Sequence, residues 1–515
     1  MARHTRQLII RRAPPFRMVG PAHVPREDSC LGTMVGRRST ASVTAMSTPA
    51  SAATALQRDL QQFLDGAAAE LGVPGAAVGI THGGVDTVAT TGVTSRADPL
   101  PIDPDTLFMI GSTSKTFTAT LAISLVQRSL LDLDRPVHEY LPGILTCPAE
   151  LHDQRAAVRV ADLFTHTAGW VGDVFFDTGP GDDALARAVA EQLPGVPQHT
   201  APGDRASYNN VSLVVAARLV ETVADDGYEN LLRSRVLEPL GLMNTFLFPA
   251  EVANRRHAVG HRAKNGAQVP VPDWPMPRCF TPTGGIVSSV RDQLAYARFH
   301  LTGECAGGDG SAAIEAPIDT STREMMRRPR SSMNPAMDVG INWFLRERAG
   351  YLLVAHGGNV SYQHLSAFAM VPDEEFAVTT LTNARPGEQL GRLVLDWAMH
   401  HVLGTVVAPL PETAPPADID QLTGDYGTGD AYVEVRRAND GLTVRTRYPA
   451  EPVLDGPRLR ARFVGDDVLA TDDDPAEPAG IFLRDGAGRV DALRWGLRLG
   501  HRMAAPGAGP VASAR

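Results

Sequence analysis

The sequence predicts an α/β domain followed by a small antiparallel β domain. Two strand-like runs near the beginning precede a mostly helical middle region, and four more strand-like runs follow it. Strands at both ends with helices between them favour one sheet that contains early and late strands. After a proline-rich segment the pattern changes to short alternating runs, which predict a separate β domain. The chain of 515 residues, 43% of them apolar, is too long for one domain and apolar enough for a large core.

Hydrophobic periodicity predicts the elements of the first domain, which we place at residues 54–404. A helical stripe starts near Thr54. The helix from Ser112 to about Arg128 is apolar nearly all round, which is typical of a central, buried helix. The other predicted helices are Asp182–Leu193, Asn210–Val223, Tyr228–Val236, Val290–Leu301 and Gln389–Val402. The predicted strands are Gly75–Ile80, Val85–Val93, Gly340–Arg346, Tyr351–His356, Leu365–Val371 and Phe376–Thr382.

The second domain follows a stiff linker at residues 405–418, which contains four prolines. Residues 419–505 then carry six short runs with turn signals between them. This pattern predicts an antiparallel, barrel-like domain. The predicted strands are Tyr432–Arg436, Leu442–Tyr448, Leu459–Val464, Val468–Thr471, Ile481–Arg484 and Val490–Trp495.

Composition and charge exclude several classes of function. The net charge of −10 offers no basic surface for nucleic acid. No run of 18 apolar residues occurs, so we expect no membrane span. Four widely spaced cysteines form neither a disulfide framework nor a zinc motif, and we expect no metal and no other cofactor. Residues 1–50 lack a secretory core and are interpreted as a disordered or untranslated extension, which makes a cytoplasmic location the default.

Lysine is rare in this chain. Only Lys115 and Lys264 occur among the 48 basic residues, so arginine supplies the positive charge almost everywhere. Arginine cannot lose its proton near neutral pH, whereas lysine can. A lysine in this chain therefore indicates a position where the side chain must be able to lose its proton. Lys264 lies in a predicted hairpin turn and is interpreted as incidental.

The first motif is Ser112-Thr113-Ser114-Lys115, at the start of the buried helix. A serine and a lysine three residues apart lie on one helix face. The helix N-terminus offers a free N–H group to a developing oxyanion. Because burial lowers the pKa of a lysine, Lys115 could accept the proton of Ser112. The alternative is a capping serine followed by a surface lysine.

The second motif is Tyr208-Asn209-Asn210, directly before another apolar helix. A tyrosine beside a lysine could relay a proton. Asn210 offers a donor and an acceptor, so it could hold Lys115 and a substrate carbonyl together. The alternative is a half-buried tyrosine next to an asparagine that caps the helix.

The third motif is His356-Gly357-Gly358-Asn359, at the end of a predicted strand. The glycines permit close approach of a substrate backbone. The N–H group of Asn359 could complete an oxyanion hole with that of Ser112. The alternative is a histidine that ends a strand before a glycine turn.

Together these motifs resemble those of the serine β-lactamase and penicillin-binding-protein-like hydrolases, which include class C β-lactamases, DD-peptidases, D-aminopeptidases and related esterases. Members carry S-x-x-K, Y-x-N and then K-T-G or H-x-G in this order. Segments 163–169 and 283–288 resemble further family motifs, and the similarity spans about residues 55–403. The resemblance implies an antiparallel sheet flanked by helices, with a mostly helical subdomain. By the same resemblance, the catalytic residues are Ser112, Lys115 and Tyr208, and the substrate-binding or oxyanion residues are Asn210, His356, Gly358 and Asn359.

One departure concerns substrate. His356 stands where K-T-G members have a lysine, and a histidine is a poorer anchor for a carboxylate. We therefore predict a serine hydrolase that forms an acyl-enzyme on Ser112 and cleaves an amide, peptide or ester in a small molecule or short peptide. A true β-lactamase stays open as an alternative, as does a catalytically silent relative that binds a ligand or peptide. Assembly into a homo-oligomer is also left open.

Overall fold

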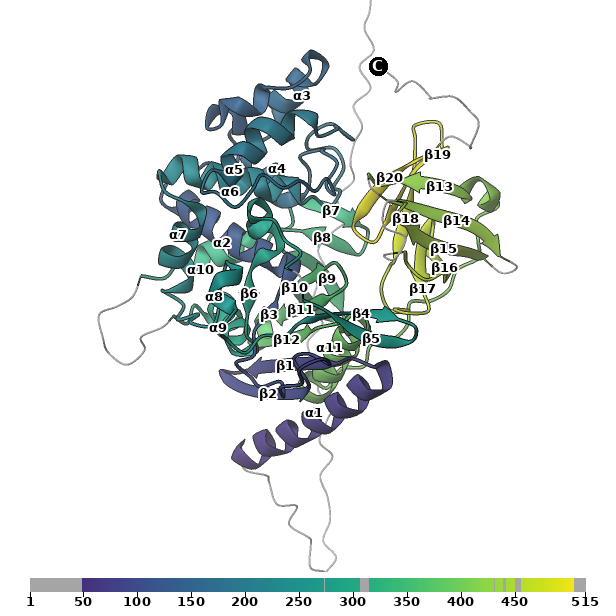
Figure 1. The fold of residues 1–515 in the computed structure, drawn as a ribbon. Coiled ribbons are helices and arrows are strands. Elements are labelled where there is room, and N and C mark those ends of the chain that lie inside the picture. The colour runs from purple at the N-terminus through teal and green to yellow at the C-terminus, as the bar shows by residue number, and fades with distance from the viewer. Residues whose placement is uncertain are drawn as a thin grey trace, which may run out of the picture. The chain divides into compact units, whose positions relative to one another are not determined.

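Figure 1 shows a computed structural model of the chain, which describes residues 49–272, 274–305, 315–429, 431–438, 441–449 and 455–503. The predicted N-terminal extension lies outside these ranges, apart from its last two residues, which begin helix α1 (Pro49–Leu71). Within the described ranges, no helix combines the length and apolar character that crossing a bilayer requires.

An eight-stranded antiparallel sheet forms the centre of the first domain. Its strands are β1 (Gly75–His82), β2 (Val85–Gly92), β7 (Ser331–Asn334), β8 (Met337–Val339), β9 (Phe344–Arg348), β10 (Tyr351–Val360), β11 (His364–Val371) and β12 (Phe376–Thr382). Their order in the sheet is β2-β1-β12-β11-β10-β9-β8-β7. Because β1 pairs with β12, the early and late strands share one sheet, as the sequence predicts. The short strands β7 and β8 were not predicted.

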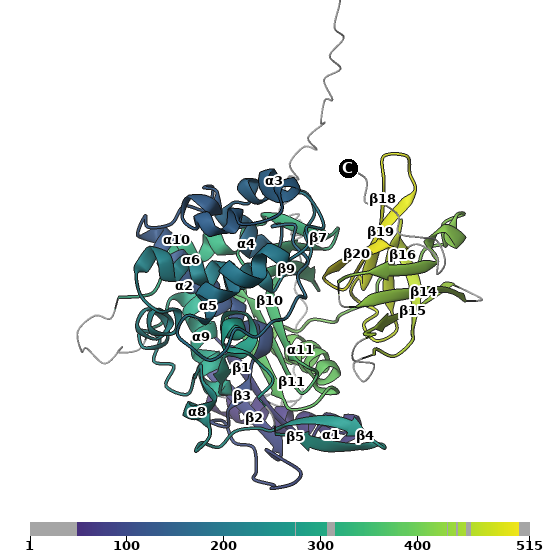
Figure 2. The same cartoon turned by 45° about the horizontal axis from the view of Figure 1, so that its top comes forward.

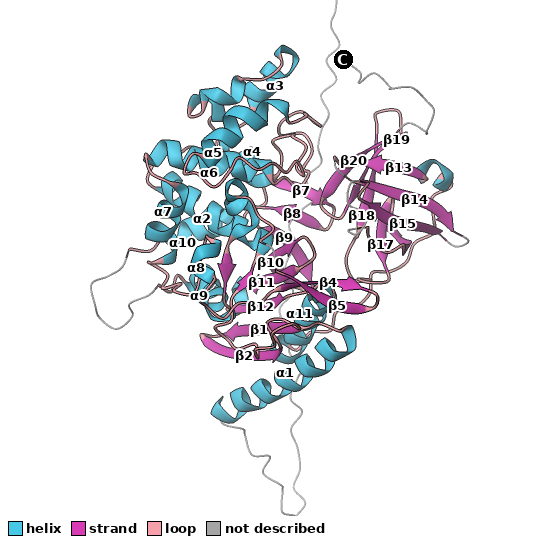
Figure 3. Cartoon of the chain, in the orientation of Figure 1, coloured by secondary structure: helices cyan, strands magenta, loops and turns pink. Residues whose placement is uncertain are grey.

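Helices cover both faces of this sheet (Figure 3). Helices α1 and α11 (Gly387–Leu403) pack on one face, where they bury Val78 and Ile80 of β1. The alternate residue Gly79 faces helix α9 (Val290–Thr302) on the other side. A Cβ atom at Gly79 would lie 2.8 Å from a methyl carbon of Leu294, so glycine lets α9 approach the sheet closely.

The helical subdomain packs around helix α2 (Ser114–Gln127), which is buried over most of its length. Two of the predicted helices, near 182 and 228, each divide into a short α-helix and a π-helical turn, which hydrophobic periodicity does not distinguish. Figure 2 shows this subdomain from a second angle. Other helices of the first domain are α3 (His152–Ala157), α4 (Val160–Thr165), α5 (Ala184–Arg187), α6 (Val211–Ala224), α7 (Tyr228–Leu232) and α8 (Pro249–Val252).

The second domain is a closed antiparallel barrel with its own apolar core. Its strands are β13 (Gly424–Gly427), β14 (Tyr432–Ala438), β15 (Gly441–Arg447), β16 (Leu459–Gly465), β17 (Val468–Thr471), β18 (Gly480–Arg484), β19 (Val490–Trp495) and β20 (Arg498–Arg502). Six of these correspond to predicted strands. The two missed strands, β13 and β20, pair with each other and close the barrel.

Candidate active site

The first motif lies where a 3₁₀ turn (Gly111–Thr113) leads into α2. The Nζ atom of Lys115 is 3.0 Å from Oγ of Ser112 and donates a second hydrogen bond of 2.7 Å to the carbonyl oxygen of Thr283. Lys115 has no exposed surface. The expected serine–lysine contact is therefore present, and the alternative of a surface lysine is wrong.

The surroundings of Lys115 favour its neutral form. Burial lowers its pKa well below the ordinary value, and the nearby positive charge of Arg498 lowers it further, while Asp173 raises it. None of the contacts described for Nζ is an ion pair with a carboxylate. A neutral lysine at hydrogen-bond distance from a serine hydroxyl has the geometry of a general base.

Strand β10 packs directly against the nucleophile turn. Its first half pairs with β9, but residues 356–360 pair only with β11, which leaves their other edge free of the sheet. A Cβ atom on Gly358 would lie 1.9 Å from the carbonyl oxygen of Ile110, and one on Gly111 would lie 2.7 Å from the backbone nitrogen of Asn359. Glycine is required at both positions for this approach. The N–H groups of Ser112 and Asn359 thus belong to two backbone segments in contact, as an oxyanion hole requires.

Tyr208 lies on the other side of Lys115. The Nζ atom is 4.9 Å from the centre of the Tyr208 ring, and Tyr208 is only 5% exposed. Burial raises its pKa above the ordinary value, although Ser112 and Arg498 lower it in part, so the phenol keeps its proton. Its hydroxyl is buried without a well-formed hydrogen bond to any residue in the described ranges. A buried unpartnered hydroxyl beside a nucleophile is suited to bind a substrate atom.

Asn210 does not contact Lys115 as the sequence suggested. Its Nδ2 atom donates a 2.8 Å hydrogen bond to Oδ1 of Asp173 instead. The neighbouring Asn209 caps α6, because its Oδ1 accepts from the backbone nitrogen of Ser212 at 2.8 Å. Asn210 is therefore buried and held beside a carboxylate.

His356 cannot supply a positive charge to the site. It is 2% exposed, and its Nδ1 atom lies 2.7 Å from the carbonyl oxygen of Gly357. Burial, reinforced by Lys115, lowers its pKa to about 3. The ring is therefore neutral at ordinary pH, and its centre lies 6.2 Å from that of Tyr208.

Arg498 is a charged residue close to Tyr208 that sequence reasoning missed. It lies at the start of β20, directly after the turn that leaves β19, and its guanidinium pairs with Asp173, with Nη2 3.0 Å from Oδ1. The guanidinium carbon is 5.0 Å from the Tyr208 ring centre. The Asp173 side chain is 9% exposed and that of Arg498 is 37% exposed.

The same barrel hairpin holds the segment that carries Tyr208. The backbone nitrogen of Tyr208 donates a 2.8 Å hydrogen bond to the carbonyl oxygen of Leu497. Arg494 donates to the carbonyl oxygen of Ala206 at 2.8 Å, and the backbone nitrogen of Leu499 donates to Oγ of Ser207 at 3.1 Å. No local pattern could have identified these contacts, because they join residues nearly 300 positions apart.

Residues suited to a metal are not gathered here. Among the residues that the structure describes, no group of three or more histidine, cysteine, aspartate or glutamate side chains could hold an ion. Each of the three described cysteines is unpaired.

Comparisons with known proteins show the family and the fold. The sequence model of the family described as Beta-lactamase matches residues 57–400. Penicillin-binding protein 4 of Amycolatopsis lactamdurans is 30% identical over 373 residues, which cover 71% of this chain and 96% of that protein. Unguisins hydrolase ungD of Aspergillus violaceofuscus is 25% identical over 482 residues, 87% of this chain and 78% of that protein. The crystal structure of SurE matches with a TM-score of 0.67 at 24% identity, over 87% of this chain and 100% of that one.

Proposed function

This chain belongs to the Beta-lactamase family, and we propose that it is a serine hydrolase that forms an acyl-enzyme on Ser112. One observation carries the proposal. The only lysine in the site is buried, has a lowered pKa and lies 3.0 Å from the serine hydroxyl. A binding protein gains nothing from holding a lysine there without a carboxylate partner.

The proposed reaction has two half-reactions, acylation of Ser112 and hydrolysis of the acyl-enzyme, and each residue acts once in each of them. Neutral Lys115 accepts the proton of Ser112 as Oγ attacks the scissile carbonyl carbon. The N–H groups of Ser112 and Asn359 stabilise the negative charge that forms on the carbonyl oxygen. The Tyr208 hydroxyl donates its proton to the leaving group and recovers one from Lys115. A water molecule then attacks the acyl-enzyme, and the same residues transfer protons in the reverse direction. This step releases the acid and restores Ser112.

We propose that the substrate is a peptide, amide or ester with a carboxylate close to the scissile bond. The Arg498 side chain is partly exposed beside Tyr208, and its Nε and Nη2 atoms are held by Asp173, so its Nη1 atom is the donor proposed to bind the substrate carboxylate. We propose that Asn210, held by Asp173, binds an amide of the acyl portion. The similarity to a penicillin-binding protein and to an unguisins hydrolase supports this substrate class.

A true β-lactamase and a silent binding relative are the competing functions. Labelling with a fluorophosphonate, followed by peptide mapping, distinguishes the silent relative, since we expect a covalent adduct on Ser112 and none in Ser112→Ala. Turnover is then compared on nitrocefin, D-amino-acid amides, peptides with a free carboxyl end and p-nitrophenyl esters. An unlabelled Ser112, with no turnover of any substrate, would contradict the hydrolase. Preferred turnover of nitrocefin would favour the β-lactamase.

A further inference from the structure

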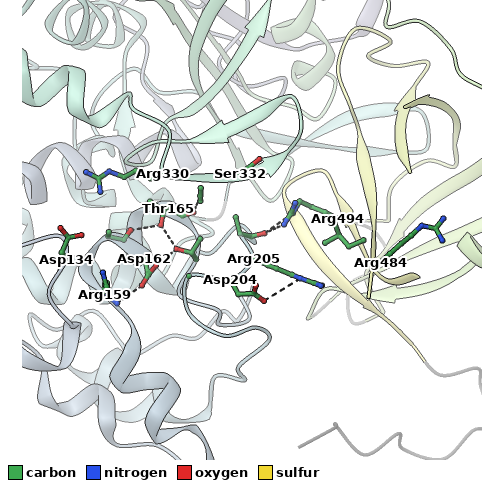
Figure 4. Close-up of a pocket in the computed structure, with 16 residues that line it drawn as sticks. Asp134, Arg159, Asp162, Thr165, Asp204, Arg205, Arg330, Ser332, Arg484 and Arg494 are labelled. Carbon is green, nitrogen blue, oxygen red and sulfur yellow. Dashed lines mark hydrogen bonds and ion pairs between the residues drawn. The ribbon is translucent and has the colours of Figure 1, made fainter. Parts of the chain in front are cut away.

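A separate cavity of about 550 Å³ lies between α4, the segment 203–206, the edge strand β7 and strands β18 and β19 of the barrel (Figure 4). Ser112, Lys115 and Tyr208 do not line it. Its volume is that of a small-molecule site. Its lining is strongly charged, with five arginines against three aspartates.

Arg494 gives this cavity a buried positive charge. It is 6% exposed and donates hydrogen bonds to the carbonyl oxygens of Ala206 and Met333, which are neutral. No carboxylate of the described chain forms an ion pair with it, and the other charge that acts on it, Arg205, is also positive. Burial and this neighbour together lower the pKa of Arg494 to about 10. A buried cation without a counter-charge is costly unless an anion accompanies it.

Two further arginines, Arg159 and Arg330, line the cavity and are exposed to solvent. Figure 4 shows Arg159 and Arg330 on one side of the cavity and Arg205 and Arg494 on the other. Neither Arg159 nor Arg330 forms an ion pair with a described residue, and the hydrogen bond described for Arg330 goes to Sδ of Met325 at 3.4 Å. Arg484 differs, because it points away and pairs with two aspartates outside the cavity.

The aspartates of the lining do not balance these charges. Asp162 already accepts from Oγ1 of Thr167 at 2.6 Å and from the backbone nitrogen of Arg159 at 2.8 Å. Asp204 lies 4.0 Å from Arg205, whose closer partner is Asp491 at 3.3 Å. Asp134 is exposed to solvent. The lining therefore carries more guanidinium groups than carboxylates, around a volume too large for an inorganic ion alone.

We propose that this cavity binds a small organic anion that carries carboxylate or phosphate groups, held between Arg159 and Arg330 on one side and Arg205 and Arg494 on the other. Guanidinium groups bind both kinds of anion through paired N–H donors. The site is independent of the reaction proposed at Ser112. Arg494 also donates a hydrogen bond to Ala206, so an anion bound in the cavity would contact a residue that supports the segment carrying Tyr208.

Isothermal titration calorimetry of the full chain, with citrate and separately with glycerol 2-phosphate at constant ionic strength, tests the proposal. We expect saturable binding of at least one anion, and the one that binds identifies the preferred head group. The double variant Arg159→Gln/Arg330→Gln should weaken that binding at least about tenfold. Its matched control, Arg291→Gln/Arg489→Gln, removes two exposed arginines elsewhere and should change the affinity less than about twofold. Absence of saturable binding to the natural chain, or equal weakening in both double variants, would overturn the site.

Discussion

The nucleophile helix and the β19–β20 hairpin of the barrel contribute to one site in different ways. Ser112 and Lys115 are held by the core of the first domain, and Lys115 is wholly buried among residues of that domain. Arg498 arrives from the second domain and remains partly exposed. In the proposed reaction, the helix therefore fixes the nucleophile and its base, whereas the hairpin fixes Tyr208, the proposed proton donor, and Arg498, the proposed substrate anchor.

This difference predicts how substitutions in each region affect the kinetics. A change in the helix removes a chemical step, because no other group can replace a neutral lysine beside Ser112. A substitution in the hairpin leaves proton transfer from Ser112 to Lys115 possible but displaces Tyr208 and Arg498. Substitutions in the two regions should therefore differ in size and in which kinetic quantity they alter.

Lys115→Arg should have the largest effect. Arginine keeps the positive charge but stays protonated, so it cannot accept the proton of Ser112. We expect kcat/KM to fall by at least about 10²–10⁴-fold, the usual contribution of general-base catalysis. The assay is kcat/KM on the best substrate, with a thermal melt to verify folding.

Lys264→Arg is the matched control, because it changes the other lysine of the chain, in the β4–β5 hairpin (Gly260–Lys264 and Ala267–Val271), and should be silent. Ser112→Ala should be as inactive as Lys115→Arg, and the double variant scarcely worse, since the two residues act as a unit. Activity of Lys115→Arg within tenfold of the natural enzyme would contradict the serine–lysine mechanism.

Removal of the barrel from residue 419 onward should have the next largest effect. The first domain contains its own large apolar cores, so we propose that it folds alone as a domain of residues 54–404. Loss of the contacts to Ala206, Ser207 and Tyr208 should lower kcat by about 10²-fold, the size expected for a misplacement near 1 Å, and should alter substrate preference. Fluorophosphonate labelling of Ser112 should persist, since it needs Lys115 and no substrate anchor.

Arg494→Gln tests the same point without truncation, because it removes the guanidinium that holds Ala206. We expect a smaller loss of kcat, about tenfold, with labelling of Ser112 retained. Arg489→Gln changes an exposed arginine of the same domain and serves as control. An insoluble truncation, or unchanged kinetics on every substrate, would be evidence against this division of labour.

The sequence predicts the region around the helix well, because its signals are local. Lys115 stands three residues from Ser112, and α2 is apolar on all sides, so spacing and periodicity suffice. The order of strands along the sequence favours one sheet that contains early and late strands, and β1 does pair with β12. The roles given to Ser112, Lys115 and Tyr208 remain predictions until activity is measured.

The region around the hairpin could not be predicted in the same way. Arg498 is one arginine among many, and only the folded chain brings it to Asp173. Asn210 was expected near Lys115, but a carboxylate 37 positions earlier binds it instead. The closing strands β13 and β20 read Gly-Asp-Tyr-Gly and Arg-Leu-Gly-His-Arg, which show no alternation of apolar and polar residues, so the sequence did not predict them.

Arg498→Gln should change selectivity more than rate. Loss of the guanidinium removes the group that we expect to bind a substrate carboxylate, while Ser112 and Lys115 are untouched. We expect the ratio of kcat/KM for a carboxylate-bearing substrate to that for its uncharged amide to fall by about tenfold. Arg502→Gln is the matched control, because Arg502 lies on the same strand and binds backbone carbonyl groups away from the site. An equal loss of kcat/KM for both substrates would show that Arg498 does not bind the substrate carboxylate.

The smallest effect, a displaced pH profile, tests whether the two regions communicate through charge. If neutral Lys115 is the base, kcat/KM rises with pH as Lys115 loses its proton. Arg498 lowers the pKa of Lys115 and Asp173 raises it. Arg498→Gln removes the lowering charge and leaves Asp173 alone, so the rising limb should move to higher pH. Asp173→Asn leaves Arg498 alone, so the limb should move to lower pH, each by up to about one unit.

The two opposite displacements distinguish electrostatic coupling from structural damage, because damage has no reason to reverse its sign between partners of one ion pair. An uncharged ester is the proper substrate for this profile, since it removes the role of Arg498 in carboxylate binding. The double variant Arg498→Gln/Asp173→Asn loses both charges, so its limb should return close to that of the natural enzyme. If all three variants move the limb in one direction, or leave it in place, the group that titrates in the free enzyme is not Lys115, and the hairpin acts on the site through contacts alone.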